Sequence, residues 1–355
     1  WYSKGSRYFE PDIMIDNQAA ITTRVAPSFL RVGQLELFAR RVRNNAHDES
    51  FNELKMIVQH LIDRNYKDEI EYEISLESKV LKLACLYRSR LISLVTNWIR
   101  VGYCQGNFNS DNCAAGGYTL DYGPFGFCEL FDPRFQPWTG GGEHFSFFNQ
   151  PSAAEINFKT FCSSLNPLLS KSEQDLEKLK QIENDFSKLM NKELMKMWAN
   201  KLGLDHYKEN LINEFFNLMF ISKADFTILF RKLSDIPNNI DSLKDSFYLS
   251  INNELIKKWE VWLKNWQSIL KKEGNIKEKS ESMKSFNPIY TWREWMVVPA
   301  YEEAEKGNYD KIKELQTVFS NPYKKQPSEI DQKYNRLKPS KYFNYGGVSH
   351  YSCSS

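Results

Sequence analysis

The residue types that could do chemistry gather in residues 106–127. Asp111 and Asn112 come just before a short apolar run, a Gly116-Gly117 pair follows, and Asp121 closes a second short run. A Gly-Gly pair between two short runs predicts a two-residue β-hairpin turn. Counting outward from that turn places Asn112 opposite Asp121, with their Cβ atoms roughly 5 Å apart. An amide oxygen and a carboxylate at that spacing can share a hard divalent cation such as Mg2+.

This layout is typical of kinase-type phosphoryl-transfer sites, in which a loop Asn and an Asp beyond a hairpin hold the metal on ATP. Turn formation alone also collects Asn, Asp and Gly in loops, so the pattern by itself has a plain structural explanation. The residues that follow favour the metal site. Asp121-Tyr122-Gly123 stands where ordinary kinases have Asp-Phe-Gly, and Pro124-Phe125-Gly126-Phe127 continues the motif.

With this motif the chain resembles the selenoprotein O family of atypical kinase-like proteins, from about residue 20 to the end. Residues 24–33, R-V-A-P-S-F-L-R-V-G, are similar to the family's R-x-A-P-S-x-L-R-x-G segment, and N-S-D-N at residues 109–112 is similar to its catalytic loop. Further similar segments lie at residues 98–102, 149–151, 223–231, 287–293, 304–307, 322–323 and 352–355.

The resemblance implies a mainly α fold with a small β-hairpin. Residues 1–165 would form a protein-kinase-like C-lobe with the catalytic loop and metal site, and residues 166–355 a helical C-terminal extension and tail. The chain begins with Trp1, and no glycine-rich phosphate loop precedes Gly33. We therefore expect that the family's N-terminal nucleotide lobe, which would make the full-length protein α+β, lies outside this chain. The chain alone would then be inactive.

The family binds ATP flipped relative to ordinary kinases, so the resemblance implies an ATP-dependent protein adenylyltransferase. AMP would pass to Ser, Thr or Tyr hydroxyls of protein substrates, and pyrophosphate would leave. By resemblance, Asn112 and Asp121 hold Mg2+, Asp121 thereby contacts ATP, and Asp111 is the candidate base. Arg24 and Arg31 match family arginines that contact ATP phosphates, a role that suits the bidentate guanidinium fork.

Three departures from the family pattern bear on these roles. Gln105 stands where the family has His. Gln can replace a His that only packs or forms hydrogen bonds, but a function is lost if that His titrates. Pro137 stands where the family has a Cys that can pair with the C-terminal Cys as a redox switch. Cys353, the candidate redox residue, has therefore lost its expected partner, and Cys128 is an alternative one.

Two other functions stay open. Ordinary γ-phosphoryl transfer would use the same metal pair, although the two arginines favour the flipped nucleotide. A catalytically inactive, pseudokinase-like binding module is compatible with Gln105 and the missing Cys. The presence of Asp111, Asn112 and Asp121 together argues against the inactive module, because a scaffold need not keep all three.

Composition limits the partners. A formal net charge of +2 gives no reason to expect nucleic acid. The sequence has no run of eighteen apolar residues, so we expect no membrane span. Six cysteines without a CxxC pair argue against zinc or a disulfide framework and favour free thiols. By analogy with the family, the compartment would be mitochondrial in a eukaryote and cytoplasmic in a bacterium.

Apolar periodicity predicts several helices. We expect them over residues 35–42, 51–62, 80–99, 172–202 and 254–270. Pro27 suits the first turn of a helix. Residues 66–78 are expected to connect helices, 271–284 to form a polar linker, and the tail after Pro327 to extend over the surface. Trp259, Trp262 and Trp266 recur at helical spacing and are expected in the core, and the glycines before His144 are expected to form a mobile loop.

Overall fold

The computed structural model describes residues 2–7, 10–18, 21–138 and 142–343. The chain forms two compact units whose segments alternate along the sequence. Unit 1 comprises residues 1–97, 107–123 and 149–193, and unit 2 comprises residues 98–106, 124–148 and 194–355. Both units are mainly helical with a small antiparallel sheet each, so the predicted fold class is correct at this level. The functional division predicted at residue 165 stays a prediction.

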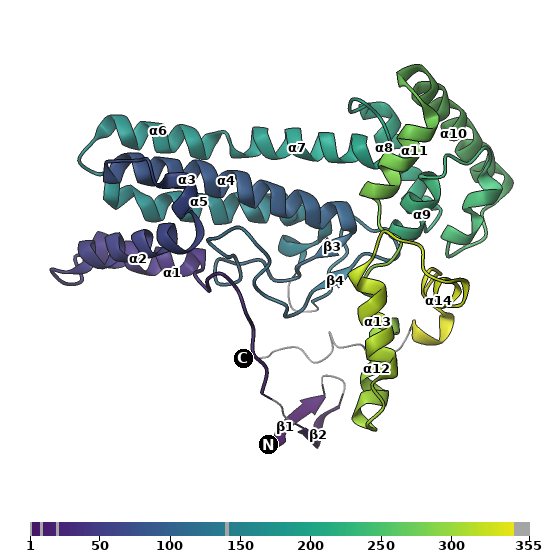
Figure 1. The fold of residues 1–355 in the computed structure, drawn as a ribbon, viewed down its shortest axis with the longest axis horizontal. Helices are drawn as coiled ribbons and strands as arrows, with labels where there is room; N and C mark the ends of the chain where they lie inside the picture. The colour runs from purple at the N-terminus through teal and green to yellow at the C-terminus, as the bar shows by residue number, and fades with distance from the viewer. Residues whose placement is uncertain (1, 8–9, 19–20, 139–141, 344–355) are drawn as a thin grey trace. The chain divides into compact units, whose positions relative to one another are not determined.

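Unit 1 is built from helices that pack side by side (Figure 1). Its elements are β1 (Tyr2–Arg7), β2 (Glu10–Gln18), α1 (Val32–Arg43), α2 (Ser50–Asn65), α3 (Lys67–Ile70), most of α4 (Leu76–Val101), α5 (Gln150–Leu169), α6 (Glu173–Asn184) and the start of α7 (Phe186–Lys201). Helix α1 contacts α2 and α5, and α5 contacts α6. The ring of Tyr87 on α4 lies 4.2 Å from that of Phe161 on α5, so α4 closes the same core.

The predicted helices of unit 1 are confirmed where one face is clearly apolar. In α2 the buried residues Leu54, Val58 and Leu61 recur every three or four positions, which is the spacing of one helical face. Helices α1 and α4 likewise contain the predicted ranges 35–42 and 80–99. The prediction for Pro27 is wrong, because α1 begins only at Val32.

The hairpin of β1 and β2 at the start of the chain was not predicted. The two strands pair antiparallel from Tyr2 opposite Gln18, with a register shift between Ser6 and Arg7. The two strands contain Gly, Lys, Asp, Asn and Pro, residue types depleted in strands, and the sequence pattern therefore gave no strand signal.

Unit 2 combines a two-stranded sheet with a larger set of helices (Figure 1). Strand β3 (Tyr103–Cys104) pairs antiparallel with β4 (Gly126–Phe127). Its further elements are η1 (Glu143–Phe145), η2 (Phe147–Asn149, of which Asn149 belongs to unit 1), the end of α7, α8 (Glu209–Ile221), α9 (Phe226–Leu233), η3 (Ile240–Ser246), α10 (Asn253–Glu273), α11 (Ile276–Phe286), α12 (Glu294–Glu305), α13 (Asp310–Ser320), α14 (Ser328–Tyr334) and η4 (Ser340–Tyr342).

The three tryptophans of α10 are core residues, as predicted. Trp259, Trp262 and Trp266 are fully buried, and each indole N–H has a hydrogen-bond acceptor. The acceptors are the Ser222 hydroxyl and the carbonyls of Leu211 and Leu202, at 2.7, 2.9 and 2.8 Å. The donors are therefore satisfied inside the core, as buried polar groups must be.

Three of the predicted segments differ in the structure. The range 172–202 holds two helices, α6 and α7, which meet at Asp185. The polar linker at 271–284 is largely α11, because Asn275 caps it by accepting from the backbone N–H of Lys277 and Glu278, and Met283 is buried. In the tail, α14 forms and buries Tyr334, so part of this segment packs instead of extending over the surface.

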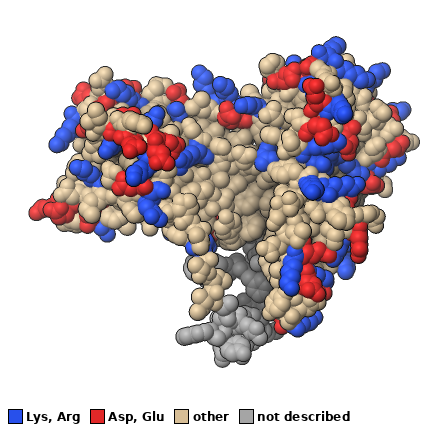
Figure 2. All heavy atoms as spheres, in the orientation of Figure 1, with Lys and Arg blue, Asp and Glu red and all other residues tan. Residues whose placement is uncertain are grey.

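The described part of the chain carries intermixed charges and free thiols. On the face drawn in Figure 2, acidic and basic side chains are intermixed over the helices. Among the described residues no helix is long and apolar enough to cross a membrane. The five described cysteines, Cys85, Cys104, Cys113, Cys128 and Cys162, are free thiols. Cys353 lies outside the described residues, as do three residues of the glycine-rich loop before His144.

Candidate functional site

The predicted hairpin around Gly116 and Gly117 does not form. Residues 107–123 contain a series of turns and no strand, so the predicted pairing of Asn112 with Asp121 across a hairpin is wrong. The two glycines serve other purposes: Gly117 has a φ of +77°, and a Cβ there would overlap Cβ of Arg90 on α4. Gly117 therefore allows the loop to lie against α4, whereas a Cβ at Gly116 would overlap the ring of Tyr118. In the sequence the same Gly-Gly pair has the pattern of a hairpin turn.

The backbone of this loop pairs instead with the segment that leads into α1. The N–H of Val32 donates to the carbonyl of Cys113 at 3.0 Å, and the N–H of Ala115 donates to the carbonyl of Leu30 at 2.9 Å. Arg31 and Ala114 form an isolated antiparallel bridge between these bonds. The structure therefore brings together two motif segments that the sequence separates by about eighty residues.

Asp111, the candidate base, lies exposed at the point where these segments touch. The N–H of Gly33 donates to the carbonyl of Ser110 at 3.0 Å. A Cβ added to Gly33 would overlap Oδ1 of Asp111, so only glycine fits at this position without a shift of the carboxylate. Gly33, at the start of α1, thus leaves space for the Asp111 carboxylate.

Asn112 is positioned by a local turn. The side chain of Asn109 accepts from the backbone N–H of Asp111 at 3.0 Å and of Asn112 at 3.2 Å. The side-chain amide of Asn112 donates to the carbonyl of Asn107 at 3.2 Å. Because the NH2 group is engaged with the backbone, the amide oxygen of Asn112 is the atom that suits a cation.

Asp121 and Arg24 lie next to each other in unit 1. Asp121 accepts from the backbone N–H of Gly123 at 3.2 Å, which closes a turn over the Asp-Tyr-Gly motif. The guanidinium of Arg24 donates to the carbonyl of Leu120 at 2.6 Å and lies over the ring of Tyr122, 5.7 Å from its centre. An arginine is therefore held beside the predicted metal ligand by its flanking residues.

Hydrogen bonds of the Arg31 backbone hold this residue at the start of α1. It stands at the N-cap of α1, and its N–H donates to Oε1 of Gln34 at 2.9 Å. The five residues predicted for catalysis, ATP binding and metal binding, Arg24, Arg31, Asp111, Asn112 and Asp121, thus belong to unit 1.

The donor set fits Mg2+ better than a transition metal. The two predicted ligands supply an amide oxygen and a carboxylate, the hard donors that Mg2+ prefers, and Mg2+ commonly takes its remaining ligands from phosphate and water. Among the described residues, no three His, Cys, Asp or Glu side chains gather to hold a metal ion. For an ion held by Asn112 and Asp121, phosphate oxygens or water would supply the remaining ligands.

The departures from the family pattern fall in unit 2. Gln105 is buried, and the hydroxyl of Tyr103 donates to its Oε1 at 2.6 Å, so Gln105 has a hydrogen-bonding and packing role. Cys128 is also buried, and its thiol contacts the carbonyl of Leu130 at 3.4 Å. Burial raises the pKa of Cys128 well above the ordinary range of a thiol, which makes it a poor nucleophile.

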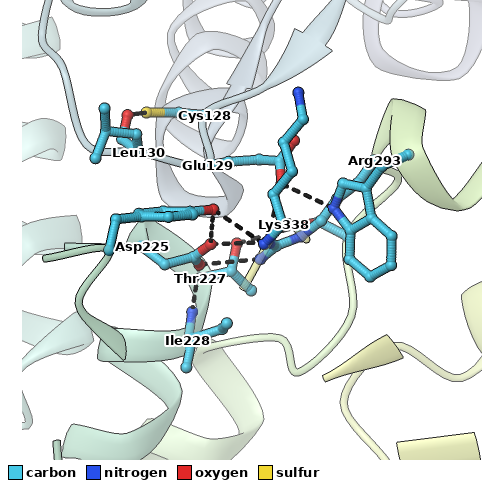
Figure 3. A network of polar contacts seen from close by, with 11 residues as sticks. Cys128, Glu129, Leu130, Asp225, Thr227, Ile228, Arg293 and Lys338 are labelled. Carbon is cyan, nitrogen blue, oxygen red and sulfur yellow. Dashed lines mark hydrogen bonds and ion pairs between the residues drawn. The ribbon is translucent and has the colours of Figure 1, made fainter. Parts of the chain in front are cut away.

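Unit 2 holds a second group of charged residues, to which the sequence assigned no role (Figure 3). Arg293 is buried, and its guanidinium binds both carboxylate oxygens of Asp225, at 2.7 and 2.9 Å. It also contacts Glu129 at 3.2 Å, and the indole N–H of Trp295 donates to the same Glu129 oxygen at 2.9 Å. Burial raises the pKa of Glu129, and the charge of Arg293 opposes that shift.

This network orders unit 2 around α9. Asp225 is the N-cap of α9 and accepts from the N–H of Ile228 at 3.0 Å. It also accepts from the hydroxyl of Tyr248 at 3.1 Å, and the N–H of Lys338 donates to that hydroxyl at 3.4 Å. The sequence did mark residues 223–231 and 287–293 as motif segments. Their contact through Asp225 and Arg293 is what the spacing could not reveal.

Comparison with known proteins gives the family. The family model described as protein adenylyltransferase SelO matches residues 4–320. A protein nucleotidyltransferase YdiU of Flavobacterium johnsoniae is 31% identical over 352 residues, covering 95% of this chain and 64% of the relative. The YdiU proteins of Aromatoleum aromaticum and Rhodopirellula baltica are 30% and 29% identical, with 63% and 65% of their lengths covered. The chain thus spans just under two thirds of these bacterial relatives, and it belongs to the protein adenylyltransferase SelO family.

Proposed function

We propose that the protein containing this chain is an ATP-dependent adenylyltransferase that modifies Ser, Thr or Tyr hydroxyls of proteins. The observation that carries the proposal is the backbone pairing of residues 30–33 with residues 110–115. Through this pairing the segment with the two arginines and the loop with Asp111 and Asn112 form one structure. Family membership supports nucleotidyl transfer as the class of reaction.

The transfer joins the acceptor oxygen to the α-phosphorus of ATP and breaks the bond to the bridging oxygen, so pyrophosphate leaves. Asp111, exposed beside Gly33, would take the hydroxyl proton of the acceptor. Asn112 and Asp121 would hold Mg2+, which neutralises phosphate charge when bound. Arg24, held beside Asp121 by the Leu120 carbonyl, and Arg31 would bind phosphate oxygens.

The helical region around this site would be the counterpart of a kinase C-lobe, with the nucleotide lobe supplied by other residues of the protein. The compared relatives are bacterial, which supports the cytoplasm, and not the mitochondrion, as the compartment of the protein. No observation supports the mitochondrial alternative.

The test uses the protein expressed from its whole reading frame, with Mg2+ and ATP labelled at the α-phosphate or, in parallel, at the γ-phosphate. The Asp121→Ala variant tests the metal ligand. Asp63→Ala is the matched control, because Asp63 lies exposed on α2 and has no predicted role. We expect α-label on protein, lost in Asp121→Ala by a factor of at least about 100 and kept in Asp63→Ala.

The other outcomes distinguish the alternatives. Label from the γ-phosphate alone would identify an ordinary kinase reaction. No label from either position, with nucleotide binding retained, would favour the inactive binding module. Equal α-label in Asp121→Ala and in the unchanged protein would contradict the assigned role of Asp121.

A further inference from the structure

Tyr122 is the middle residue of the Asp-Tyr-Gly motif, and it has no role in the proposed reaction so far. Its side chain is 55% exposed, and the guanidinium of Arg24 lies over its ring, 5.7 Å from the ring centre. A cation at this distance from an aromatic ring is attracted by the negative face of the ring. Both residues belong to unit 1, so the contact lies within one compact unit.

The backbone around Arg24 has little apolar packing of its own. Ile21 and Val25, which lie close to Arg24 in the sequence, are 91% and 89% exposed. The segment is held firmly further along the chain, where Ser28 is buried and its N–H donates to the hydroxyl of Tyr118 at 3.1 Å. The position of the Arg24 guanidinium therefore depends on the contacts that its own side chain makes.

The contacts of the Arg24 side chain come from the two residues that flank Asp121. Nη1 of Arg24 donates to the carbonyl of Leu120 at 2.6 Å, and Tyr122 supplies the ring. Because Leu120 and Tyr122 are the direct neighbours of Asp121, these contacts keep the guanidinium near the predicted metal ligand. Neither contact neutralises the arginine, since a carbonyl and a ring carry no net charge. Among the described residues, no carboxylate forms an ion pair with Arg24, so its charge is left for an anionic ligand.

A guanidinium that is held in advance binds phosphate better. An arginine side chain has many rotamers, and ordering it when a ligand arrives costs free energy. A ring and a carbonyl that already restrict Arg24 reduce this cost. The ring attracts the charge without accepting a conventional hydrogen bond, so N–H donors beyond the one given to Leu120 remain for phosphate oxygens.

We infer that Tyr122 is a positioning residue, whose ring holds Arg24 beside Asp121 before the phosphates of ATP bind. The inference rests on the proposed phosphate role of Arg24 and adds a residue that acts through it. The plain alternative is that two exposed side chains touch at the surface without consequence. That alternative gives no reason why both contacts of Arg24 flank the same carboxylate, and it predicts no effect of the ring on nucleotide affinity.

The first experiment measures nucleotide affinity by isothermal calorimetry with Mg2+, on the protein expressed from its whole reading frame. The probe is ATP with a methylene group between the α- and β-phosphates, which cannot release pyrophosphate. Adenosine, which lacks the phosphates, is the matched ligand. Tyr122→Leu should weaken the ATP analogue about threefold and leave adenosine unchanged, because only the phosphates need Arg24.

Two further tyrosine variants separate the ring from other effects. Tyr122→Phe keeps the ring and loses the hydroxyl, which donates to the carbonyl of Thr119 at 3.4 Å, so it should bind the ATP analogue as the unchanged protein does. Tyr72→Leu is the matched control, because Tyr72 is an 87% exposed tyrosine of the same unit with no predicted role. It should change neither affinity.

A double-variant cycle shows whether Tyr122 acts through Arg24. Arg24→Ala should weaken the ATP analogue by at least about tenfold. Adding Tyr122→Leu to Arg24→Ala should cause no further loss, because the ring then has no guanidinium to hold. The side chain of Tyr122 is exposed, so we expect these variants to fold, and unchanged adenosine affinity verifies it.

Additive losses in the cycle would overturn the inference. So would a Tyr122→Leu variant that binds the ATP analogue normally, or one that loses affinity for the analogue and for adenosine equally. Unchanged affinity of Arg24→Ala for the analogue would overturn the inference together with the phosphate role of Arg24. Adenylylation itself is measured separately by transfer of α-label, so it can stand when the positioning role fails.

Discussion

Two groups of carboxylates in this chain differ in how they are held. In unit 1 Asp111 is exposed, and it is positioned by backbone hydrogen bonds and by the absence of a side chain at Gly33. In unit 2 Asp225 is fully buried, and its two oxygens are bound by Arg293, Tyr248 and the N-terminus of α9. A carboxylate that must meet a substrate needs the first environment, and one that must order a fold needs the second.

The comparison teaches that the segments that resemble the family do not all have the same kind of role. Both groups lie in segments that resemble the family. Only the environment separates them, because a buried carboxylate whose oxygens are all bound has nothing left to offer a ligand.

The largest effect is expected for Asp111→Asn. Losing the base should lower protein adenylylation by about 10² to 10⁴-fold, while the free energy of unfolding stays within about 0.5 kcal/mol because the side chain is exposed. Initial rates with α-labelled ATP and urea denaturation measure the two quantities. The control is Asp63→Asn, which should change neither. A variant that loses stability together with activity would show that Asp111 is also structural.

Asp225→Ala, unlike Asp111→Asn, should act on stability. Removing this carboxylate leaves the guanidinium of Arg293 buried with only Glu129 as a charged partner, which should cost about 3 to 5 kcal/mol of unfolding free energy. Urea denaturation measures the change. The double variant Asp225→Leu/Arg293→Met should recover much of the loss, because it removes both charges. No recovery would mean that the capping of α9 matters more than the ion pair.

Gly33→Ala tests the contact that positions Asp111. The added methyl would overlap Oδ1 of Asp111, the movable end of an exposed side chain, so we expect a loss of unfolding free energy of less than about 1 kcal/mol. In an Asp111→Ala background the methyl has room, and most of this cost should disappear. Urea denaturation of the four proteins gives the coupling energy directly. Additive changes would show that the clash is relieved elsewhere.

The smallest effect concerns a buried lysine of unit 2. The Nζ of Lys201 donates to the carbonyl of Arg100 and to Asn287, at 2.7 and 2.9 Å. Burial, aided by the charge of Arg100, lowers the pKa of Lys201 well below its usual range.

The sign of the resulting pH dependence follows from proton binding. Between the lowered pKa and the ordinary value of about 10.4, the unfolded chain binds the proton and the folded chain does not. Stability relative to Lys201→Met should therefore rise with pH in that window, by at most about 1.4 kcal/mol per pH unit. Urea denaturation from pH 6 to 9 measures it, and parallel curves for the two proteins would contradict the shift.

The sequence predicted helices well where one face of the helix is buried and the other is exposed. The faces of α1, α2, α4 and α10 repeat at helical spacing, and the tryptophans of α10 were placed correctly in the core. Prediction failed where a capping residue or a tertiary contact decides the local structure. Asn275 starts a helix in a segment with little apolar content, and Tyr334 is buried in a tail that looked solvated.

By itself, the sequence determined the family and the identity of the predicted site residues, because residue types at fixed spacing are local information. Tertiary structure alone decided how those residues are held. The glycine pair that predicted a hairpin lies against α4, and the backbone of the loop pairs with the segment before α1. Likewise, the pairing of Asp225 with Arg293 joins positions sixty-eight residues apart. Such partners depend on which surfaces meet after folding, and no local pattern records that.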